Sequence, residues 1–197
     1  MEIFDISQEV FGCKVFPGDP SPERIVKMNM SEGSLYNLSD ISMCVHNGTH
    51  IDAPYHFIND GKTVERVDLD RFIGYAYVAE HNGNIGRTDA ERILSDAEKC
   101  DKRAAERILV KGDAVVTAEA ARVFADAHIK LFGNESQTVG PENAPMEVHL
   151  IMLGAEIVLL EGIRPADVPA GAYLLHAAPL NLRGCDGSPC RATLIKI

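Results

Sequence analysis

Short apolar runs separated by turn residues dominate the chain and predict several strands. Residues 41–45 alternate between apolar and polar side chains, which is typical of a strand with one apolar face that ends at His46. Fully apolar runs, as in strands buried on both faces, cover residues 108–110 and 157–160, and residues 129–132 also have strand character. Two further strands are expected over 173–182 and 191–197, joined by a turn rich in glycine.

Capping residues predict three helices between these strands. Thr88 followed by Glu91 forms a capping box, Thr117 can cap a second helix, and Pro145 fits the first turn of a third. The helices are expected over residues 88–97, 117–127 and 144–153. Because helices and strands interleave along the chain, the predicted fold class is mixed α/β.

Composition and charge are those of a globular protein. The chain has 197 residues, 46% of them hydrophobic and 24% charged, and it shows neither a repeat nor a Pro/Gly-rich linker, so we expect a single domain over 1–197. Nineteen basic against 29 acidic residues give a net charge of −10. This charge disfavours binding to nucleic acid and to anionic membranes.

The sequence predicts a cytoplasmic location. Its apolar stretches fall short of the roughly 18 residues needed to span a bilayer, and its first residues lack the pattern of a secretory signal. The five cysteines are an odd number, scattered and without a Cys-x-x-Cys pair. This usage indicates reduced thiols rather than disulfides or a thiolate zinc site.

The highest density of side chains that can bind metals or transfer protons lies in residues 46–56, HNGTHIDAPYH. This segment contains three of the seven histidines and a carboxylate. Gly48, two β-branched residues and Pro54 disfavour a helix, so we expect a strand or a tight turn. In an extended segment, alternate side chains point to the same side. One face would then collect His46, His50, Asp52 and His56.

Imidazole nitrogens together with carboxylate oxygens suit zinc or manganese, and sites without thiolate are more often catalytic than structural. A hydrogen-bonded turn is the alternative for any one histidine, but four such side chains on one face favour a metal site. Glu161 follows the buried run 157–160, where an unpaired charge is costly unless a cation or hydrogen-bond donors compensate it. An ordinary salt bridge is the alternative for Glu161.

The segment resembles the motif of the cyclase-like metal-dependent hydrolases, the family of bacterial kynurenine formamidase. That motif is His-x-Gly-Thr-His-x-Asp-x-Pro-x-His, and residues 46–56 match every fixed position. His149 and Glu161 have the family's spacing, the latter in a Leu-Glu-Gly context. Residues 16–19 (FPGD) and 184–192 are also similar to family segments, so the resemblance covers almost the whole chain.

The resemblance implies a swivelling β/β/α-type fold with a central barrel-like sheet flanked by helices, assembled as a homodimer or higher homo-oligomer. It implies hydrolysis of a carbon–nitrogen bond in a small aromatic amide or formamide such as N-formylkynurenine, a reaction of tryptophan catabolism. One or two divalent ions would take part, Zn²⁺ in the first place and Mn²⁺ as the alternative.

The family also implies roles for individual residues. Its ligands of two metal ions correspond to His46, His50, Asp52, His149 and Glu161. The first three would bind one ion and His149 the second, while Asp52 and Glu161 would contact both. His56 would be the general acid/base, oriented by Glu161, so the implied catalytic residues are His56 and Glu161.

Phe16 stands where kynurenine formamidases typically have a tryptophan that packs on the substrate, and this chain has no tryptophan. Phenylalanine still offers a flat apolar face for substrate binding. A member that resembles isatin hydrolase or cleaves a lactone, with a single manganese ion, is a competing interpretation. A metal-binding protein without catalysis is another, although a purely structural site does not need His56. His176 could line the site, but a hydrogen-bonded strand histidine is the simpler interpretation.

Overall fold

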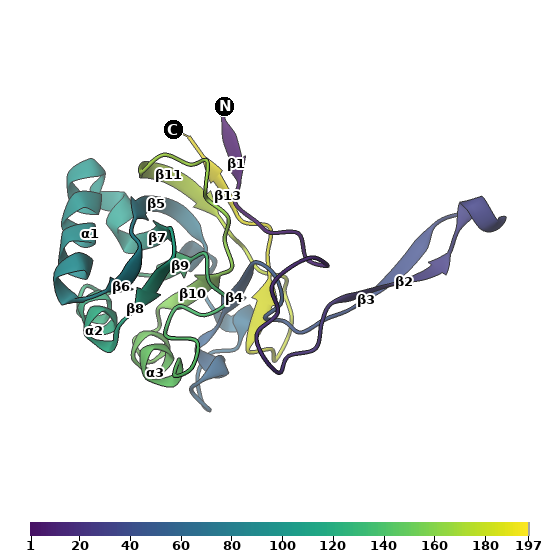
Figure 1. Cartoon of the computed structure of the whole chain (residues 1–197), viewed down its shortest axis with the longest axis horizontal. Coiled ribbons are helices and arrows are strands. Elements are labelled where there is room, and N and C mark those ends of the chain that lie inside the picture. The colour runs from purple at the N-terminus through teal and green to yellow at the C-terminus, as the bar shows by residue number, and fades with distance from the viewer. Residues whose placement is uncertain (197) are drawn as a thin grey trace.

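The computed structural model describes residues 1–196 and is built around one nine-stranded sheet that curls like half a barrel (Figure 1). Its strands, in spatial order, are β1 (Ile3–Asp5), β13 (Thr193–Ile195), β11 (Gly171–His176), β5 (Ile73–Glu80), β7 (Arg107–Lys111), β9 (Leu131–Asn134), β10 (Val158–Glu161), β4 (His50–Asp52) and β12 (Gly187–Pro189). The four strands from β5 to β10 are parallel, whereas both ends of the sheet are antiparallel.

Three helices pack side by side along one face of this sheet (Figure 1). They are α1 (Arg87–Cys100), α2 (Ala118–Asp126) and α3 (Met146–Gly154). The predicted cap of α2 is confirmed, because Thr117 Oγ1 accepts a hydrogen bond from Ala120 N at 3.3 Å. The predicted cap of α1 is wrong: the chain enters the helix at Gly86, whose N–H donates to Asp89 at 3.1 Å, so Thr88 lies inside the first turn.

Two apolar clusters hold the layers together. One lies between the helices and the sheet and includes Ile93, Phe124 and Phe132. The other fills the opposite face and includes Ile51 and Leu175. The prediction of a mixed α/β fold with a barrel-like sheet is therefore confirmed, with the helices on one face.

The central buried strands agree with the apolar runs of the sequence, but the expected ends of other strands are wrong. The strand expected over 173–182 ends at His176, and the glycine-rich turn after it contains β12, which pairs with β4. The final strand is limited to β13, and Ile197 lies outside the described residues. These errors arise because pairing partners, rather than local pattern, decide where a short strand begins and ends.

A two-stranded arm extends away from the body of the molecule (Figure 1). It is formed by β2 (Glu23–Met28) and β3 (Leu38–Ser42), which pair antiparallel and are exposed along almost their whole length. The strand expected over 41–45 therefore begins and ends earlier than predicted. A further small parallel pair joins β6 (Gly83–Ile85) to β8 (Ala114–Val116) beside α1.

Candidate metal centre

Strand β4 organises the candidate site because it lies between two strands from distant parts of the chain. Its antiparallel pairing with β10 places Glu161 directly opposite His50. Its pairing with β12 places Gly187 opposite Asp52, and Asp186 immediately precedes that glycine. Carboxylates from positions 161 and 186 are thereby brought to the same strand.

His46 reaches this region from the loop before β4 rather than from a continuous strand over 46–56. Asn47 closes the loop, because its side-chain oxygen accepts from Cys44 N at 2.9 Å and its N–H donates to Cys44 O at 3.1 Å. A Cβ atom at position 187 would lie 2.7 Å from His46 Cε1, so Gly187 leaves the space that this imidazole occupies. The motif side chains thus come together as expected, but from a loop and a short strand instead of one continuous strand.

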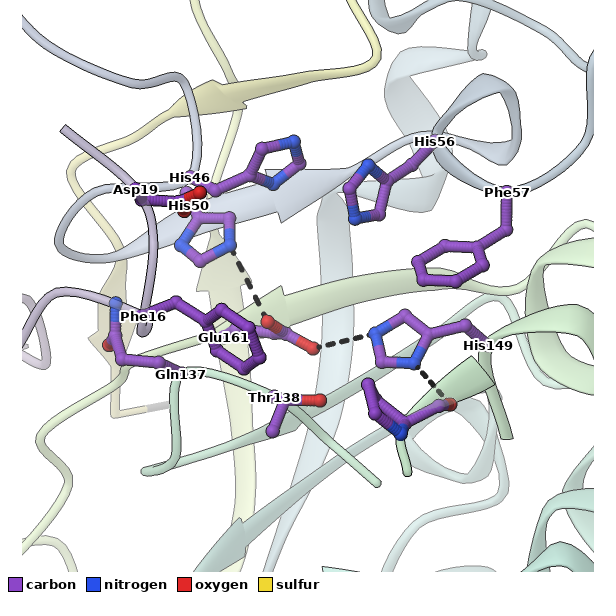
Figure 2. Close-up of a pocket in the computed structure, with 11 residues that line it drawn as sticks. Phe16, Asp19, His46, His50, His56, Phe57, Gln137, Thr138, His149 and Glu161 are labelled. Atoms are coloured by element: carbon purple, nitrogen blue, oxygen red, sulfur yellow. Dashed lines mark hydrogen bonds and ion pairs between the residues drawn. The ribbon is translucent and has the colours of Figure 1, made fainter. Parts of the chain in front are cut away.

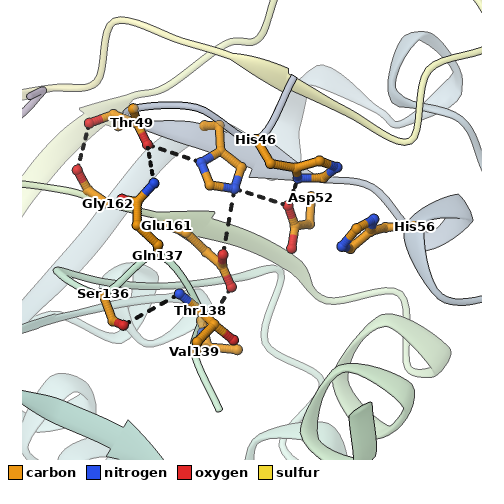
Figure 3. A network of polar contacts seen from close by, with 12 residues as sticks. His46, Thr49, Asp52, His56, Ser136, Gln137, Thr138, Val139, Glu161 and Gly162 are labelled. Atoms are coloured by element: carbon orange, nitrogen blue, oxygen red, sulfur yellow. Dashed lines mark hydrogen bonds and ion pairs between the residues drawn. The ribbon is translucent and has the colours of Figure 1, made fainter. Parts of the chain in front are cut away.

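Three imidazoles surround two buried carboxylates at the centre of the site, of which Figure 2 shows Glu161 and Figure 3 shows Asp52. Asp52 Oδ1 lies 2.8 Å from His46 Nδ1 and 3.3 Å from His50 Nε2, while its Oδ2 lies 3.6 Å from His149 Nε2. Glu161 lies 3.5 Å from His50 Nε2 through Oε2 and 3.3 Å from His149 Nε2 through Oε1. All five side chains that were expected as metal ligands therefore come together.

The backbone fixes the orientation of two of these imidazoles. His50 Nδ1 donates to Gly48 O at 3.0 Å, and His149 Nδ1 donates to Pro145 O at 2.9 Å from one turn earlier in the chain. Such a bond at Nδ1 leaves Nε2 unprotonated in the neutral ring and available as a ligand atom. Both Nε2 atoms point toward the buried carboxylates.

A second set of hydrogen bonds holds the backbone around the carboxylates (Figure 3). Glu161 Oε1 accepts from Val139 N at 2.8 Å. Thr49 Oγ1 donates to Gly162 O at 2.7 Å, which joins the end of β10 to the start of β4. Gly162 itself has φ +68°, and a side chain there would collide with Gln137 and with the oxygen of Gly48.

The cluster has the composition and the geometry of a divalent cation site. Two triads share Asp52: His46, His50 and Asp52 form one, and Asp52, His149 and Glu161 form the other. His46, His56 and Asp186 form a further triad at the outer edge, and the ligand atoms within each triad lie within 4.8 Å of one another. Among the described residues, His50 Nε2 is buried and makes no hydrogen bond of good geometry, although Asp52 and Glu161 lie within 3.5 Å of it. Imidazole with carboxylate is the donor set that Zn²⁺ and Mn²⁺ accept. The residues therefore fit a metal ion, and Asp52 belongs to both triads.

The pKa values of these groups show how the site balances its charges without a cation. Burial acts to lower the pKa of His46, but the carboxylates of Asp52 and Asp186 outweigh it and raise that pKa to about 11. The pKa of His50 rises to about 9, because Asp52 and Glu161 outweigh the effect of burial in the same way. Burial acts to raise the pKa of Asp52, yet the neighbouring imidazolium groups hold it well below its usual range. Protons on the imidazoles thus occupy positions that a metal ion would take.

His56 lies at the outer edge of the cluster, at the end of the short 3₁₀ helix Pro54–His56 (Figure 3). Its Nδ1 atom lies 3.0 Å from Asp186 Oδ2. The contacts given by the structure for Glu161 are with His50, His149 and Val139 N, so the carboxylate beside His56 is Asp186 instead of the expected Glu161. Hydrogen bonds from His46 and His56 hold the pKa of Asp186 well below its usual range.

A pocket of about 240 Å³ opens onto this cluster (Figure 2). Phe16, the expected substrate-binding residue, lines it, as does His56. Sequence reasoning missed several other lining residues, which are Asp19, Phe57, Gln137, Thr138 and Pro145. Residues 137 and 138 belong to the loop between β9 and α3, which carries no motif that indicates a pocket.

The remaining candidates lie elsewhere. His176 is exposed at the end of β11 and does not line the pocket. All five cysteines are free, as the sequence predicts. Among the described residues, every helix is too short or too polar to cross a membrane.

Comparison with known proteins gives a consistent family assignment. The family model described as putative cyclase matches residues 4–141. The chain is 34% identical over 211 residues to the curated kynurenine formamidase of Salinibacter ruber, covering 98% of this chain and 97% of that protein. It is 32% identical over 206 residues to the kynurenine formamidase of Erythrobacter litoralis, covering 98% and 93% of the two chains.

Solved structures share the fold. A potential metal-dependent hydrolase with cyclase activity matches with a TM-score of 0.81 and 28% identity, covering 98% of this chain and 96% of the other. Isatin hydrolase A from Labrenzia aggregata also gives a TM-score of 0.81, but at 22% identity it shows a common fold alone. The nearly full-length similarity to amidohydrolases confirms the prediction of an enzyme. On the family match and this full-length identity, the chain belongs to the putative cyclase family.

Proposed function

We propose that this chain is a metal-dependent hydrolase that cleaves the carbon–nitrogen bond of a small aromatic formamide or amide such as N-formylkynurenine. The observation that carries the proposal is the buried pair Asp52 and Glu161, surrounded by three imidazoles that line one pocket together with Glu161 and His56. Relatives named kynurenine formamidase support the choice of substrate class.

The two triads that share Asp52 would hold one or two divalent ions, Zn²⁺ in the first place and Mn²⁺ as the alternative. A bound ion would polarise the substrate carbonyl and lower the pKa of water toward about 7. The protein holds the ligand atoms ready for this role, because hydrogen bonds to Gly48 O and Pro145 O fix two of the rings.

His56 is the group that moves protons in the proposed reaction. It accepts a proton from the attacking water as the new carbon–oxygen bond forms at the formyl carbon. It then returns that proton to the leaving nitrogen as the carbon–nitrogen bond breaks, which releases formate and an aromatic amine. General acid–base catalysis of this kind contributes on the order of 10²–10⁴-fold to the rate.

The pocket suits a small aromatic substrate. Phe16 and Phe57 both line it and provide apolar rings for stacking. Thr138 Oγ1 is buried without a hydrogen-bond partner among the described residues, and it lines the same pocket. A substrate carbonyl or amide that bonded to this hydroxyl would remove the cost of leaving it unpaired.

The proposal is tested with purified protein that is stripped of metal and reloaded with either Zn²⁺ or Mn²⁺. We expect the loaded enzyme to hydrolyse N-formylkynurenine with a higher kcat/KM than isatin or a simple aryl lactone. Preferred cleavage of isatin with one bound manganese ion would instead support the alternative of an enzyme that resembles isatin hydrolase. Bound metal with no hydrolysis of any of the three would support a metal-binding protein.

His56→Ala tests the catalytic part of the proposal. We expect kcat to fall by about 10²–10⁴-fold, because the proton carrier is lost, while the metal content stays that of the wild type. Metal analysis and kinetics of the same preparation measure both quantities. His176→Ala is the matched control, since that histidine is exposed away from the pocket. Full activity of the His56 variant would contradict the assigned role.

A further inference from the structure

We infer that Asp186 is the positioning residue for His56: its carboxylate selects the ring tautomer and the orientation in which His56 Nε2 is the proton acceptor. The inference rests on the proposed function, because it assigns a partner to the proposed acid/base. The carboxylate of Glu161, for which the family resemblance implied this task, is engaged by His50, His149 and Val139 N.

The geometry at Asp186 is that of one oxygen shared by two rings. Its Oδ2 atom lies 3.0 Å from His56 Nδ1 and 2.8 Å from His46 Nε2. The two rings themselves are close, with centroids 4.1 Å apart and planes tilted by 34°. The carboxylate therefore holds both imidazoles at a fixed distance from each other.

The chemistry of the hydrogen bond decides the tautomer. An ionised carboxylate only accepts hydrogen bonds, so the His56 nitrogen that faces it must carry the proton. In the neutral ring the proton then lies on Nδ1, and Nε2 keeps its lone pair for a proton from water. The same arrangement, with the proton on Nδ1 and the lone pair on Nε2, occurs where an aspartate orients a catalytic histidine.

The fold fixes Asp186 in this place through its backbone. Ala53 N donates to Asp186 O at 2.9 Å, and the next residue, Gly187, pairs with Asp52 in β4. The strand that carries the metal ligands thus also aligns the carboxylate with His56, which follows Ala53 by three residues. The Asp186 side chain is 40% exposed, so it is not a member of the buried carboxylate pair.

The ring contacts of His56 do not by themselves select one of its two nitrogens. The structure places it against the ring of Phe57, with centroids 4.7 Å apart, and 6.2 Å from the ring of His149. These are contacts between ring faces and edges, and they do not distinguish the two nitrogens. Only the bond to Asp186 among the described hydrogen bonds of His56 does so.

Asp186→Asn tests the inference with little change in volume. The asparagine amide can donate to His56 Nδ1, which favours the wrong tautomer, and we expect kcat to fall by about 10²–10⁴-fold with KM nearly unchanged. Asp186→Glu, which restores an acceptor, should recover part of kcat. Asp126→Asn, at the exposed end of α2, is the matched control and should match the wild type.

Two measurements separate this role from a merely structural one. Metal analysis of Asp186→Asn should show wild-type content, because His46 keeps its bond to Asp52; parallel loss of metal and activity would mean that Asp186 supports His46 instead and would overturn the inference. Nitrogen-15 NMR of the wild type should show His56 protonated at Nδ1 when neutral, and a proton on Nε2 would overturn it even if the variant failed to fold.

Failure of the inference and failure of the proposed function give different results. If the wild type cleaves the formamide and Asp186→Asn keeps its kcat, the function stands and the positioning role is wrong. If the wild type cleaves none of the substrates, the function is wrong, while the NMR tautomer of His56 still decides whether Asp186 sets the ring.

Discussion

At the scale of single residues, two carboxylates determine the character of the site. Asp52 is 1% exposed and Glu161 2% exposed, so neither can rely on water to stabilise its charge. Buried charges of this kind are costly unless they are paired or bound to a cation. The protonated imidazoles provide that pairing in the metal-free protein, and the same side chains form the two triads that share Asp52.

Asp52→Asn is expected to weaken metal binding by more than about tenfold, because Asp52 supplies an oxygen to both triads and the amide carries no charge. The increase in Tm that Zn²⁺ gives the wild type should shrink accordingly. Calorimetric titration and thermal unfolding with and without the ion measure both effects. Asp126→Asn serves as the control, and unchanged affinity in Asp52→Asn would exclude a shared ligand at this position.

At the scale of elements, the arm formed by β2 and β3 differs from the rest of the fold. Its strands expose Ile25, Val26, Leu38 and Ile41, each at least 40% accessible. A two-stranded hairpin without a packing partner is only marginally stable in water. The arm joins Phe16 and Asp19 of the pocket to His46 of the metal cluster, so its order matters for the site.

The expectation of a homo-oligomer therefore has a structural test. We expect a second copy of the chain to cover the arm, since apolar side chains on an exposed strand pair favour association. Replacing Ile25 and Ile41 together by threonine should shift the protein toward monomer in light scattering at micromolar concentration. An unchanged mass would assign the oligomer to another surface, and a monomeric wild type would contradict the expectation itself.

At the scale of the whole molecule, the raised pKa values make stability depend on pH. The folded-state pKa values of His46 and His50 are about 11 and about 9, against about 6.5 in the unfolded chain. Their contribution to stability is fully present below pH 6.5 and is lost as the pH rises toward those values. The lowered pKa values of Asp52 and Asp186 have the opposite effect. Their contribution to stability is present above the ordinary carboxyl pKa of 3.8 and is lost as the pH falls below that value.

The metal-free protein should therefore lose Tm as the pH rises from 6.5 to 9. With Zn²⁺ bound the trend should reverse, because protons and metal compete for the same imidazoles and the competition from protons weakens at higher pH. Thermal unfolding in chelator and in excess metal across this range measures the two trends. A metal-free Tm that stays constant between pH 6.5 and 9 would contradict the pairing of His46 and His50 with the carboxylates.

Local pattern was sufficient for part of the fold. The central strands β7 and β10 coincide with apolar runs, and Thr117 caps α2 as predicted, because such features depend on residues close in sequence. Other features depend on distant partners. Helix α1 begins earlier than predicted, because the chain enters it at Gly86. Strand β12 was not predicted within its turn, because it exists only through its pairing with β4.

The sequence by itself determined which side chains are candidates for the chemistry: the spacing of residues 46–56 and the position of Glu161 after a buried strand predicted a cluster that the structure assembles. Only the tertiary structure decided which carboxylate serves which imidazole. Asp186 lies 130 positions from His56, and the pairing of β12 with β4 brings them within 3.0 Å. The physical reason is that side-chain type and local spacing depend only on residues close in sequence, whereas strand pairing depends on the packing of the entire sheet.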